Sequence, residues 1–255
     1  MKASVLIANY NGEKYIDDCI DSLKNQTFKD FEIIFFDDCS SDNSLNVISK
    51  YKNVKIITND KRGLISSYNQ MNAYKKAFEV SSGEYIFTLD SDDYYHYQKI
   101  EKVINSFNIS TNLFFDLPIY IKNNKKIFSI NKNKKIRLSS FPFFSQQSAM
   151  TFRRKIFEDM YSRIFINDFP DVWFDFRAAI YSKFFFGKVE ILGDYLTFYR
   201  KTDNNISSRF VYMRKRWWQR RMQCHLYVKK FLENNNTRFK NNLDFYITNC
   251  INKIL

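Results

Sequence analysis

Short apolar runs and helix-like patterns alternate along the first hundred residues. Continuous apolar runs bounded by polar residues predict strands buried on both faces, at Ala3–Ala8, Phe31–Phe36, Val54–Thr58 and Tyr85–Leu89. Apolar residues at helical spacing predict helices between them, over Tyr15–Asn25, Ser41–Tyr51 and Ser66–Val80. Strands that alternate with helices in this order predict right-handed crossovers, and therefore an α/β fold with a mainly parallel sheet and helices on both faces.

The alternation becomes irregular beyond residue 100. The predicted elements there are helices over Ile100–Phe107, Asp171–Phe184 and Arg209–Leu232, with short strands over Leu113–Tyr120, Ile127–Ile130, Val189–Leu192 and Leu196–Tyr199. The chain has only five glycines and three prolines, so we expect no flexible linker between domains. The pattern predicts one compact domain over residues 1–207 and a helical extension over residues 208–255.

Positive charge is concentrated in the second part of the chain. Residues 1–100 hold 12 Lys or Arg against 15 Asp or Glu, whereas residues 101–255 hold 28 against 12 and carry the whole excess of the net charge of +13. This asymmetry indicates a basic surface for an anionic partner, and membrane phospholipid, a phosphate-linked acceptor and nucleic acid are the candidates. A lysine-rich solubilising surface is the alternative.

Several classes of protein are excluded by what the sequence lacks. The four cysteines share no CxxC spacing and no nearby histidine, which argues against a zinc site and a disulfide framework. The apolar start of the chain is too short for a signal peptide, and no run of about 18 apolar residues could span a membrane. We therefore expect a cytoplasmic protein with free thiols.

Polar clusters follow three of the predicted parallel strands. They are Ala8-Asn9-Tyr10, Asp37-Asp38 and Asp90-Ser91-Asp92. In open sheets of this kind ligands bind beyond the carboxyl ends of the strands, so we expect these clusters to meet at one crevice.

Three carboxylates crowd together in Asp90-Ser91-Asp92-Asp93, directly after a strand. Their mutual repulsion is relieved by a cation, and hard oxygen ligands suit Mg²⁺ or Mn²⁺, which in turn would hold a pyrophosphate. The alternative is a solvated acidic turn that caps the next helix.

Further residues extend these clusters into an ordered series. It comprises Ala8-Asn9-Tyr10-Asn11, Ser22-Leu23, Gln26-Thr27-Phe28, Glu32-Ile33-Ile34, Asp37-Asp38-Cys39-Ser40-Ser41-Asp42 with Ser44, and Gly83-Glu84-Tyr85-Ile86 before Leu89-Asp90-Ser91-Asp92-Asp93. The series resembles family 2 glycosyltransferases of the GT-A (Rossmann-like) fold. The similarity is dense over residues 3–100, thin through the middle and present again over residues 168–207. It implies a nucleotide-sugar-binding half over residues 1–100 and an acceptor-binding half over residues 101–207.

The resemblance implies roles for the strand-end residues. Asp38 matches the acid that accepts a hydrogen bond from uracil, and a carboxylate opposite an imide N–H is a sound discriminator for that base. Ala8, Asn9 and Tyr10 would line the base pocket, with Tyr10 as a stacking face, although Tyr10 could be an ordinary buried tyrosine and Asp38 a helix cap. Asp92 matches the direct ligand of the metal. Asp90 and Ser91 would reach the ribose or a metal-bound water, and we assign Asp90 to the metal site as well.

The catalytic base is expected in Phe169-Pro170-Asp171-Val172-Trp173-Phe174-Asp175-Phe176-Arg177. Transfer with inversion needs a carboxylate that takes the proton from the acceptor hydroxyl. The family usually has a Glu-Asp pair at this place. Asp171 matches the second acid of that pair, and Pro170 replaces the first. Asp171 is therefore our candidate, with Asp168 and Asp175 as fallback bases and an N-cap as the structural alternative.

Two segments depart from the family pattern. Tyr199-Arg200-Lys201-Thr202-Asp203-Asn204-Asn205-Ile206-Ser207 resembles a loop over the donor diphosphate, but Thr202 replaces a histidine, which leaves Arg200 and Lys201 to stabilise the leaving UDP. Tyr68 stands where the family commonly has an arginine. These departures put metal affinity and phosphate binding in doubt, but not the fold.

The basic and aromatic segment Arg214–Arg221 holds two tryptophans among five cations. It is typical of an interfacial membrane helix, and a helix that packs on the catalytic domain with solvated charges is an equal alternative. Nucleic acid is the poorer interpretation because no binding motif accompanies the charge.

The sequence therefore predicts an inverting, metal-dependent transferase that moves a hexose or N-acetylhexosamine from a UDP-sugar to a hydroxyl of a surface glycan or lipid-linked oligosaccharide. We expect it in the cytoplasm or on the inner face of the cytoplasmic membrane. Two alternatives remain open. One is a nucleotidyltransferase, and the other is a non-catalytic carbohydrate- or membrane-binding protein that kept the fold.

Overall fold

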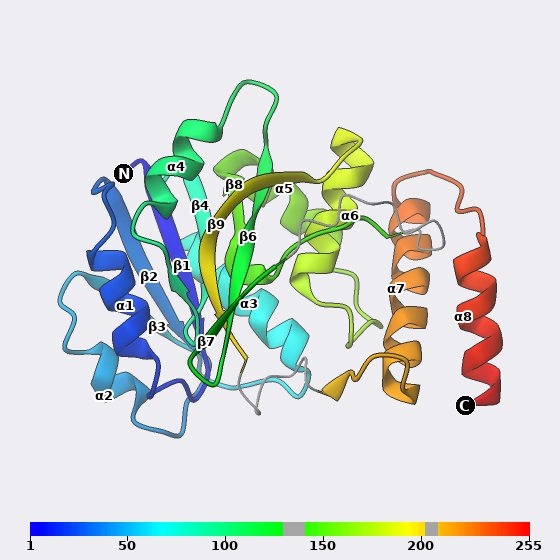
Figure 1. Ribbon diagram of the computed structural model, residues 1–255, viewed down its shortest axis with the longest axis horizontal. Coiled ribbons are helices and arrows are strands. Elements are labelled where there is room, and N and C mark those ends of the chain that lie inside the picture. The colour runs from blue at the N-terminus through cyan, green and yellow to red at the C-terminus, as the bar shows by residue number, and fades with distance from the viewer. Residues whose placement is uncertain (130–140, 202–208) are drawn as a thin grey trace.

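The computed structural model describes residues 1–129, 141–201 and 209–255, and it confirms the α/β class (Figure 1). Within these residues a nine-stranded sheet has the order β3-β2-β1-β4-β8-β6-β9-β5, and β7 pairs with β6. Helices cover both faces of the sheet, and the two C-terminal helices lie at the far end of the molecule from β3 (Figure 1).

The first half is a parallel sheet with the predicted crossovers. Its elements are β1 (Ala3–Asn9), α1 (Ile16–Lys24), β2 (Phe31–Asp37), α2 (Ser44–Ile48), β3 (Val54–Thr58), α3 (Ser66–Glu79) and β4 (Tyr85–Asp90). The predicted helix over Ser41–Tyr51 was too long, because Ser41 belongs to the turn before it, where its backbone N–H donates to Asn11 Oδ1 at 2.8 Å.

The second half is mixed rather than regular. Its elements are β5 (Tyr94–Tyr95), α4 (Lys99–Ser106), β6 (Leu113–Lys122), β7 (Lys125–Phe128), the 3₁₀ turn η1 (Gln147–Ala149), β8 (Met150–Arg153), α5 (Arg154–Ile164), α6 (Phe174–Phe186) and β9 (Glu190–Arg200). Strand β8 lies antiparallel between β4 and β6, whereas β9 runs parallel to β6.

Three sequence predictions in this half need correction. The two short strands expected at Val189–Leu192 and Leu196–Tyr199 form the single strand β9. Its pairing with β6 continues along both parts, with shifts of register between them. Helix α6 begins at Phe174 and not at Asp171, because Trp173 takes the N-cap position in extended conformation. The pair β8–α5 was not predicted, and Ile130, expected at the end of a strand, lies outside the described residues.

The parallel strands bury both faces, which explains their continuous apolar sequences. In β1, Val5 and Ile7 face the core under α1, α2 and α4, while Leu6 faces a larger core under α3, α5 and α6. A fully buried ion pair joins Lys99 of α4 to Asp116 of β6 at 2.9 Å, and Lys99 also donates to Thr197 of β9 at 2.7 Å. This pair ties helix α4 to two strands of the second half of the sheet.

The C-terminal extension is helical as expected, but it contains two helices. Helix α7 (Lys215–Asn234) buries Cys224, Tyr227 and Phe231 in the same core as α6. Helix α8 (Leu243–Ile254), which was not predicted, packs on α7. The boundary predicted at residue 207 falls in a segment outside the described residues.

Among the described residues, we find no helix with both the length and the apolar character needed to cross a bilayer. The four cysteines are free thiols.

Candidate active site

The strand-end clusters meet through the register of β1 with its two neighbours. Ala8 pairs with Asp90 of β4, and Asn9 pairs with Asp37 of β2. The buried amide of Asn9 donates to Asp37 Oδ1 at 2.7 Å and accepts from Ser91 Oγ at 2.6 Å. A Cβ at Gly12 would lie 2.3 Å from the Asn9 amide oxygen, so this crossing of β1 and the Asp-rich turn requires glycine.

The acidic turn after β4 forms a compact group of oxygens. One carboxylate oxygen from each of Asp90, Asp92 and Asp93 lies within 4.8 Å of the others. Burial and the Asp92 charge raise the pKa of Asp90 to about 7. Burial also raises the pKa of Asp92, and burial together with both neighbouring carboxylates raises the pKa of Asp93 well above its usual value. A divalent cation would relieve the repulsion between these carboxylates and prefers hard oxygen ligands. The three acids therefore fit such an ion.

The three carboxylates differ in their other partners. Asp90 accepts from Gln70 Nε2 at 2.9 Å and from the Tyr74 hydroxyl at 2.8 Å, both from α3. Asp93 is bonded by Ser148 Oγ at 2.5 Å and by the backbone N–H of Arg200 at 2.9 Å. Among the described residues, no other side chain donates to the Asp92 carboxylate. Of the three acids, Asp92 therefore has the most capacity left to coordinate a metal ion.

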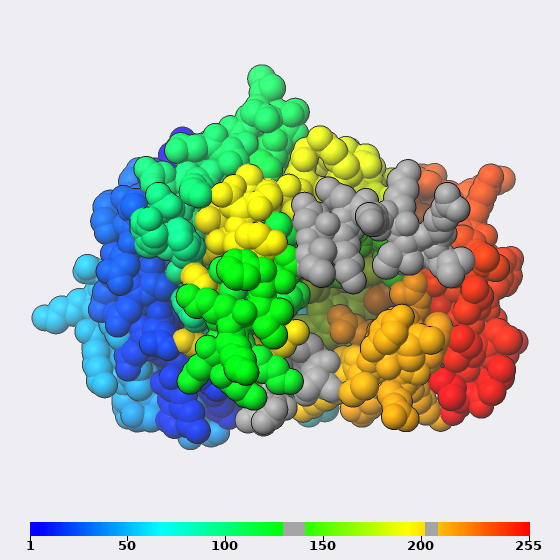
Figure 2. All heavy atoms as spheres, in the orientation of Figure 1, coloured from blue at the N-terminus to red at the C-terminus, as the bar shows by residue number. Residues whose placement is uncertain are grey.

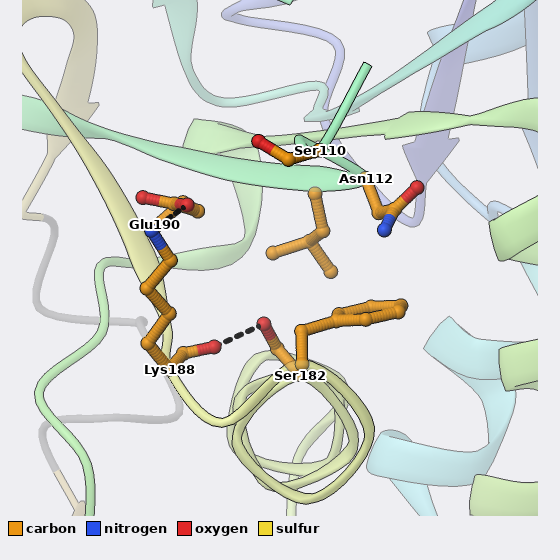
Figure 3. A pocket seen from close by; sticks show the side chains of 7 residues that line it. Ser110, Asn112, Ser182, Lys188 and Glu190 are labelled. Atoms are coloured by element: carbon orange, nitrogen blue, oxygen red, sulfur yellow. Dashed lines mark hydrogen bonds and ion pairs between the residues drawn. The ribbon is translucent and has the colours of Figure 1, made fainter. Parts of the chain in front are cut away.

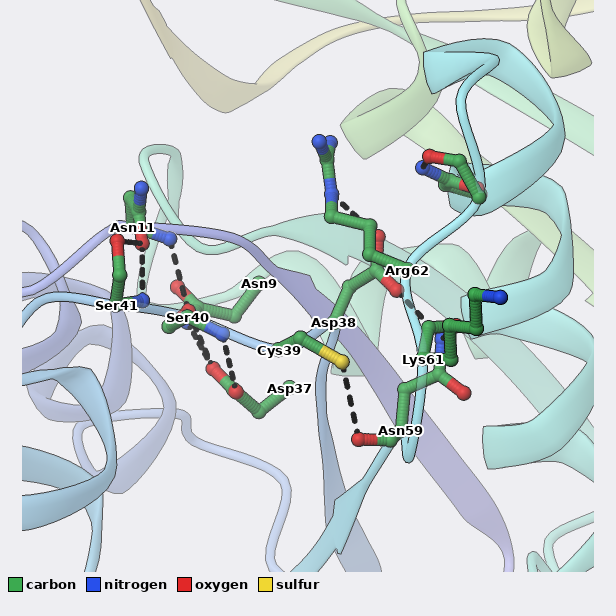
Figure 4. A network of polar contacts seen from close by, with 12 residues as sticks. Asn9, Asn11, Asp37, Asp38, Cys39, Ser40, Ser41, Asn59, Lys61 and Arg62 are labelled. Carbon is green, nitrogen blue, oxygen red and sulfur yellow. Dashed lines mark hydrogen bonds and ion pairs between the residues drawn. The ribbon is translucent and has the colours of Figure 1, made fainter.

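Asp38 is surrounded by cationic and amide donors (Figure 4). Its carboxylate accepts from Asn59 Nδ2 and from Arg62 Nε, both at 2.8 Å. The Arg62 guanidinium lies over the ring of Tyr10 at 3.4 Å from its centroid. Arg62 therefore covers one face of the Tyr10 ring, on which the sequence analysis expects the uracil base to stack. It also bonds to the Asp38 carboxylate, which is expected to bind the same base. A base that uses both groups has to move Arg62 or stack on it.

Arg200 is the last residue of β9, and Lys201 follows it. Arg200 Nη1 donates to the backbone oxygen of Asp92 at 3.1 Å, and Nη2 pairs with Asp18 at 2.5 Å. The Lys201 ammonium lies 4.1 Å from the centroid of Tyr120. Arg200 thus places positive charge directly beside the acidic turn. The expected departure at Thr202 lies outside the described residues.

Asp171 is held by residues from two other helices. Its backbone N–H donates to Gln223 Oε1 at 3.0 Å, and Gln223 Nε2 donates to Asp171 Oδ2 at 2.9 Å. The buried guanidinium of Arg177 donates to four carbonyl oxygens of the preceding loop, those of Ile164, Ile166, Phe169 and Val172. Asp171 is therefore not an N-cap, because α6 starts three residues later. Its position is set by a buried cation and by α7.

The two fallback acids have different surroundings. Burial raises the pKa of Asp175, and the Asp175 charge is among the causes that raise the pKa of Asp90. Asp168 has a φ of 78° and occupies a turn. Tyr68, in place of a family arginine, accepts from the backbone N–H of Phe169 at 2.9 Å and so supports the loop that carries Asp171.

A separate small pocket of about 160 Å³ lies at the amino ends of β6 and β9, away from the acidic turn (Figure 3). Its two charged side chains, Lys188 and Glu190, pair with each other at 2.6 Å. Ser182 donates to the backbone oxygen of Lys188 at 2.8 Å. We assign no chemistry to this pocket because its two charged groups neutralise each other.

An open α/β sheet with an acidic cluster at the carboxyl ends of its strands is typical of nucleotide-binding proteins. A narrower assignment comes from the match of residues 4–169 to the model of glycosyl transferase family 2. The chain belongs to this family, as its sequence predicts. The match gives no support to the nucleotidyltransferase alternative.

Curated relatives carry the same family likeness. The chain is 28% identical to an uncharacterized glycosyltransferase of Nostoc sp. over 219 residues, which cover 78% of this chain and 65% of the relative. It is 41% identical to a poly(ribitol-phosphate) beta-glucosyltransferase of Bacillus spizizenii over 100 residues, which cover 37% of this chain and 15% of the relative. The chain thus spans less than two thirds of the length of these relatives.

Solved structures share the fold over nearly the whole chain. TarS residues 1–349 of S. aureus in complex with UDP-GlcNAc matches with a TM-score of 0.66 at 18% identity, over 99% of this chain and 70% of TarS. The mannosyltransferase PcManGT of Pyrobaculum calidifontis, in complex with GDP-Man and Mn²⁺, matches with a TM-score of 0.61 at 13% identity, over 99% and 69%. At these identities the likeness shows the GT-A fold.

Two groups at this site were missed from the sequence. Arg62 follows β3 in the polar run Asn59-Asp60-Lys61-Arg62, so the rule that ligands lie beyond strand ends could have identified it. Gln223 lies mid-helix in α7 without a motif. Only the packing of α7 against the loop of Asp171 reveals its contact.

Proposed function

We propose that the protein is an inverting glycosyltransferase that transfers a hexose or N-acetylhexosamine from a UDP-sugar to a hydroxyl of a surface glycan or lipid-linked oligosaccharide. The observation that carries this proposal is the acidic turn of Asp90, Asp92 and Asp93 at the carboxyl ends of parallel strands in a family 2 chain. The UDP-GlcNAc bound to TarS supports the donor class, since TarS has the same fold.

The donor nucleotide would lie across the ends of β1 and β2. Ala8, Asn9 and Tyr10 would form the base pocket, and Asp38 would accept a hydrogen bond from the uracil imide. The diphosphate would extend toward the acidic turn, where Asp92 and Asp90 would hold Mn²⁺ or Mg²⁺. Ser91, between these two acids in the sequence, donates to Asn9. PcManGT with Mn²⁺ supports the metal without fixing its identity.

The residues of this chain would then divide the transfer among them. Asp171 takes the proton from the acceptor hydroxyl while that oxygen bonds to the anomeric carbon, and the bond from this carbon to the UDP oxygen breaks with its electron pair on UDP. A bound divalent cation supplies electrostatic stabilisation of the leaving diphosphate. Arg200 and Lys201 add positive charge on the same side. Attack opposite the leaving group inverts the anomeric carbon.

The basic C-terminal helices would bring the enzyme to its acceptor. Eleven Lys or Arg and two acids lie in residues 209–255, and an anionic bilayer attracts such a surface. A peripheral position on the inner face of the cytoplasmic membrane suits a lipid-linked acceptor. A free surface glycan is the other acceptor class.

Donor hydrolysis tests the proposed function. A working transferase slowly releases UDP from its own donor, so we expect metal-dependent UDP release from one or two members of a UDP-sugar panel. Asp92→Ala should lower this release by about 100-fold or more, because it removes the acid with free ligand capacity. Exposed Asp21→Ala is the matched control and should behave as the wild type. If no UDP-sugar binds with or without metal, the transferase proposal fails and the non-catalytic alternative stands.

A further inference from the structure

A polar pocket of about 310 Å³ opens between the first turn of α3, the loop that carries Asp171 and the start of α7. Its lining includes Ser66, Asp171, Trp173, Arg209, Phe210 and Arg216. Ser67 Oγ donates to the backbone oxygen of Pro170 at 2.6 Å and joins two of these walls. The acids of the metal cluster do not line this pocket.

Its charge is positive except at the proposed base. Asp171 is the single acid of the lining, and among the described residues neither Arg209 nor Arg216 pairs with a carboxylate. By contrast, Arg62 pairs with Asp38 and Arg221 pairs with Asp244. Two exposed guanidinium groups therefore border the pocket with their charge uncompensated.

The N-terminus of α3 adds to this positive field. The helix has 14 residues, and its N-cap, Ile65, offers no side chain to the first backbone N–H groups. The N–H of Tyr68 donates to the backbone oxygen of Ile65 at 3.1 Å, whereas those of Ser66 and Ser67 have no acceptor among the described residues. The helix dipole makes this end favourable for an anion. Ser66 and Ser67, the first two helical residues, line the pocket. Two arginines and an uncapped helix end thus converge beside one carboxylate.

We propose that this pocket binds a phosphate group of the acceptor, so that the acceptor is a phosphate-bearing sugar or polyol with its attacking hydroxyl beside Asp171. The proposal rests on the proposed function, because it takes Asp171 as the base. Guanidinium groups and free backbone N–H groups are the donors that bind phosphate oxygens. The anion would fix the distance between the acceptor and the base.

The donor's diphosphate is the competing anion, and the site's layout argues against it. A diphosphate held by a cation has to lie at Asp90, Asp92 and Asp93, beside Arg200, none of which lines the pocket. The pocket is lined by the proposed catalytic base, Asp171, which the acceptor hydroxyl has to reach. Its anion is therefore assigned to the acceptor.

Calorimetric titration of the full chain tests this assignment. The protein is first saturated with UDP and Mg²⁺. Glycerol 3-phosphate is then titrated into one sample of the protein, and glycerol is titrated into another. We expect saturable binding of glycerol 3-phosphate and none of glycerol. The double substitution Arg209→Gln with Arg216→Gln should weaken it by about tenfold or more, because two charge-assisted contacts are lost. Arg214→Gln is the matched control, since Arg214 is exposed on the same segment but does not line the pocket. It should leave the affinity unchanged.

Three results would overturn the phosphate site. They are no binding of glycerol 3-phosphate to the saturated wild type, equal affinity in the wild type and the double variant, and a double variant that loses affinity for UDP instead. The last result would assign the arginines to the donor. Failure of the proposed function gives a different pattern: no UDP-sugar is bound or hydrolysed, while glycerol 3-phosphate still binds the nucleotide-free protein through Arg209 and Arg216.

Discussion

Asp171 illustrates how a single catalytic candidate is oriented by residues distant from it. Within the part of the chain that the structure describes, Arg177 has no carboxylate partner for its buried guanidinium. It donates instead to four carbonyl oxygens, which fixes the loop that carries the acid. Gln223 then holds the carboxylate from α7. Carbonyl oxygens satisfy the buried charge, because an unbonded guanidinium would be costly to bury. The candidate base is thus held in place before any acceptor arrives.

Substitution of Asp171 should separate chemistry from donor binding. Asp171→Asn keeps the size and one acceptor for Gln223 but removes the proton acceptor, so transfer should fall by about 100-fold to 10,000-fold. Donor affinity, measured by titration with UDP and metal, should remain that of the wild type. Asp175→Asn serves as the comparison, and a larger loss of transfer in that variant would move the base from Asp171 to Asp175.

Helices α7 and α8 are joined by a cluster of three polar side chains that lies among aromatic residues. Asp244 of α8 pairs with Arg221 of α7 at 2.6 Å and lies 3.5 Å from His225. His225 is 1% exposed and contacts the rings of Phe141 and Phe245. Burial lowers the pKa of His225, Arg221 lowers it further, and Asp244 opposes both. The histidine therefore stays neutral in the folded protein at neutral pH.

This burial predicts a pH dependence of stability. Because the folded pKa of His225 is lowered, the unfolded chain takes up a proton that the folded chain resists as the pH falls below about 6.5. The contribution of His225 to stability is therefore present at higher pH and is lost toward pH 5. His225→Gln should flatten the fall in the free energy of unfolding between pH 7.5 and 5.5, measured by urea denaturation at several pH values. Parallel pH profiles of variant and wild type would contradict this.

An excess of positive charge, from 11 Lys or Arg against 2 acids in residues 209–255, lies at the end opposite the parallel half-sheet. Helices α7 and α8 are at that end (Figure 1), and Figure 2 shows their spheres, in orange and red, exposed on the surface. Exposed apolar side chains accompany the cations there, namely Val211, Tyr212, Met213, Leu243, Tyr246 and Ile254. Removal of the extension would also strip Tyr227 and Phe231 from the core, so charge substitutions give the cleaner experiment.

Vesicle sedimentation tests the membrane surface. We expect the full chain to bind vesicles that contain anionic lipid and to leave neutral vesicles in solution. Joint substitution of Arg214, Lys230, Lys240 and Lys253 by Gln should lower anionic binding by more than about tenfold, at about 1 kcal/mol for each cation near the surface. Equivalent substitution of Lys52, Lys55, Lys75 and Lys76, on the opposite half, is the control. Unchanged binding by the first variant would leave α7 and α8 as packing helices only.

Much of the site follows from the sequence because parallel strands bring their carboxyl ends to one edge. Asp38, Asp90 and Asp92 could be placed in this way, and the family resemblance added Asp171, although their roles remain proposals. Arg62 was missed, although it follows the end of β3 and lies within the residues that match the family model. Gln223 could not be found, since its contact with Asp171 spans 52 residues and depends on how α7 packs.

Local periodicity and the spacing of polar clusters determined, without coordinates, the parallel half of the sheet, its helices and the family. Those features depend on residues near one another in the chain, where burial on two faces or on one stripe leaves a direct pattern. Tertiary structure alone decided the insertion of β8 between β4 and β6, the continuity of β9 and the placement of α7 against Asp171. Each depends on contacts between distant segments, whose free energy has no signature in a short stretch of sequence.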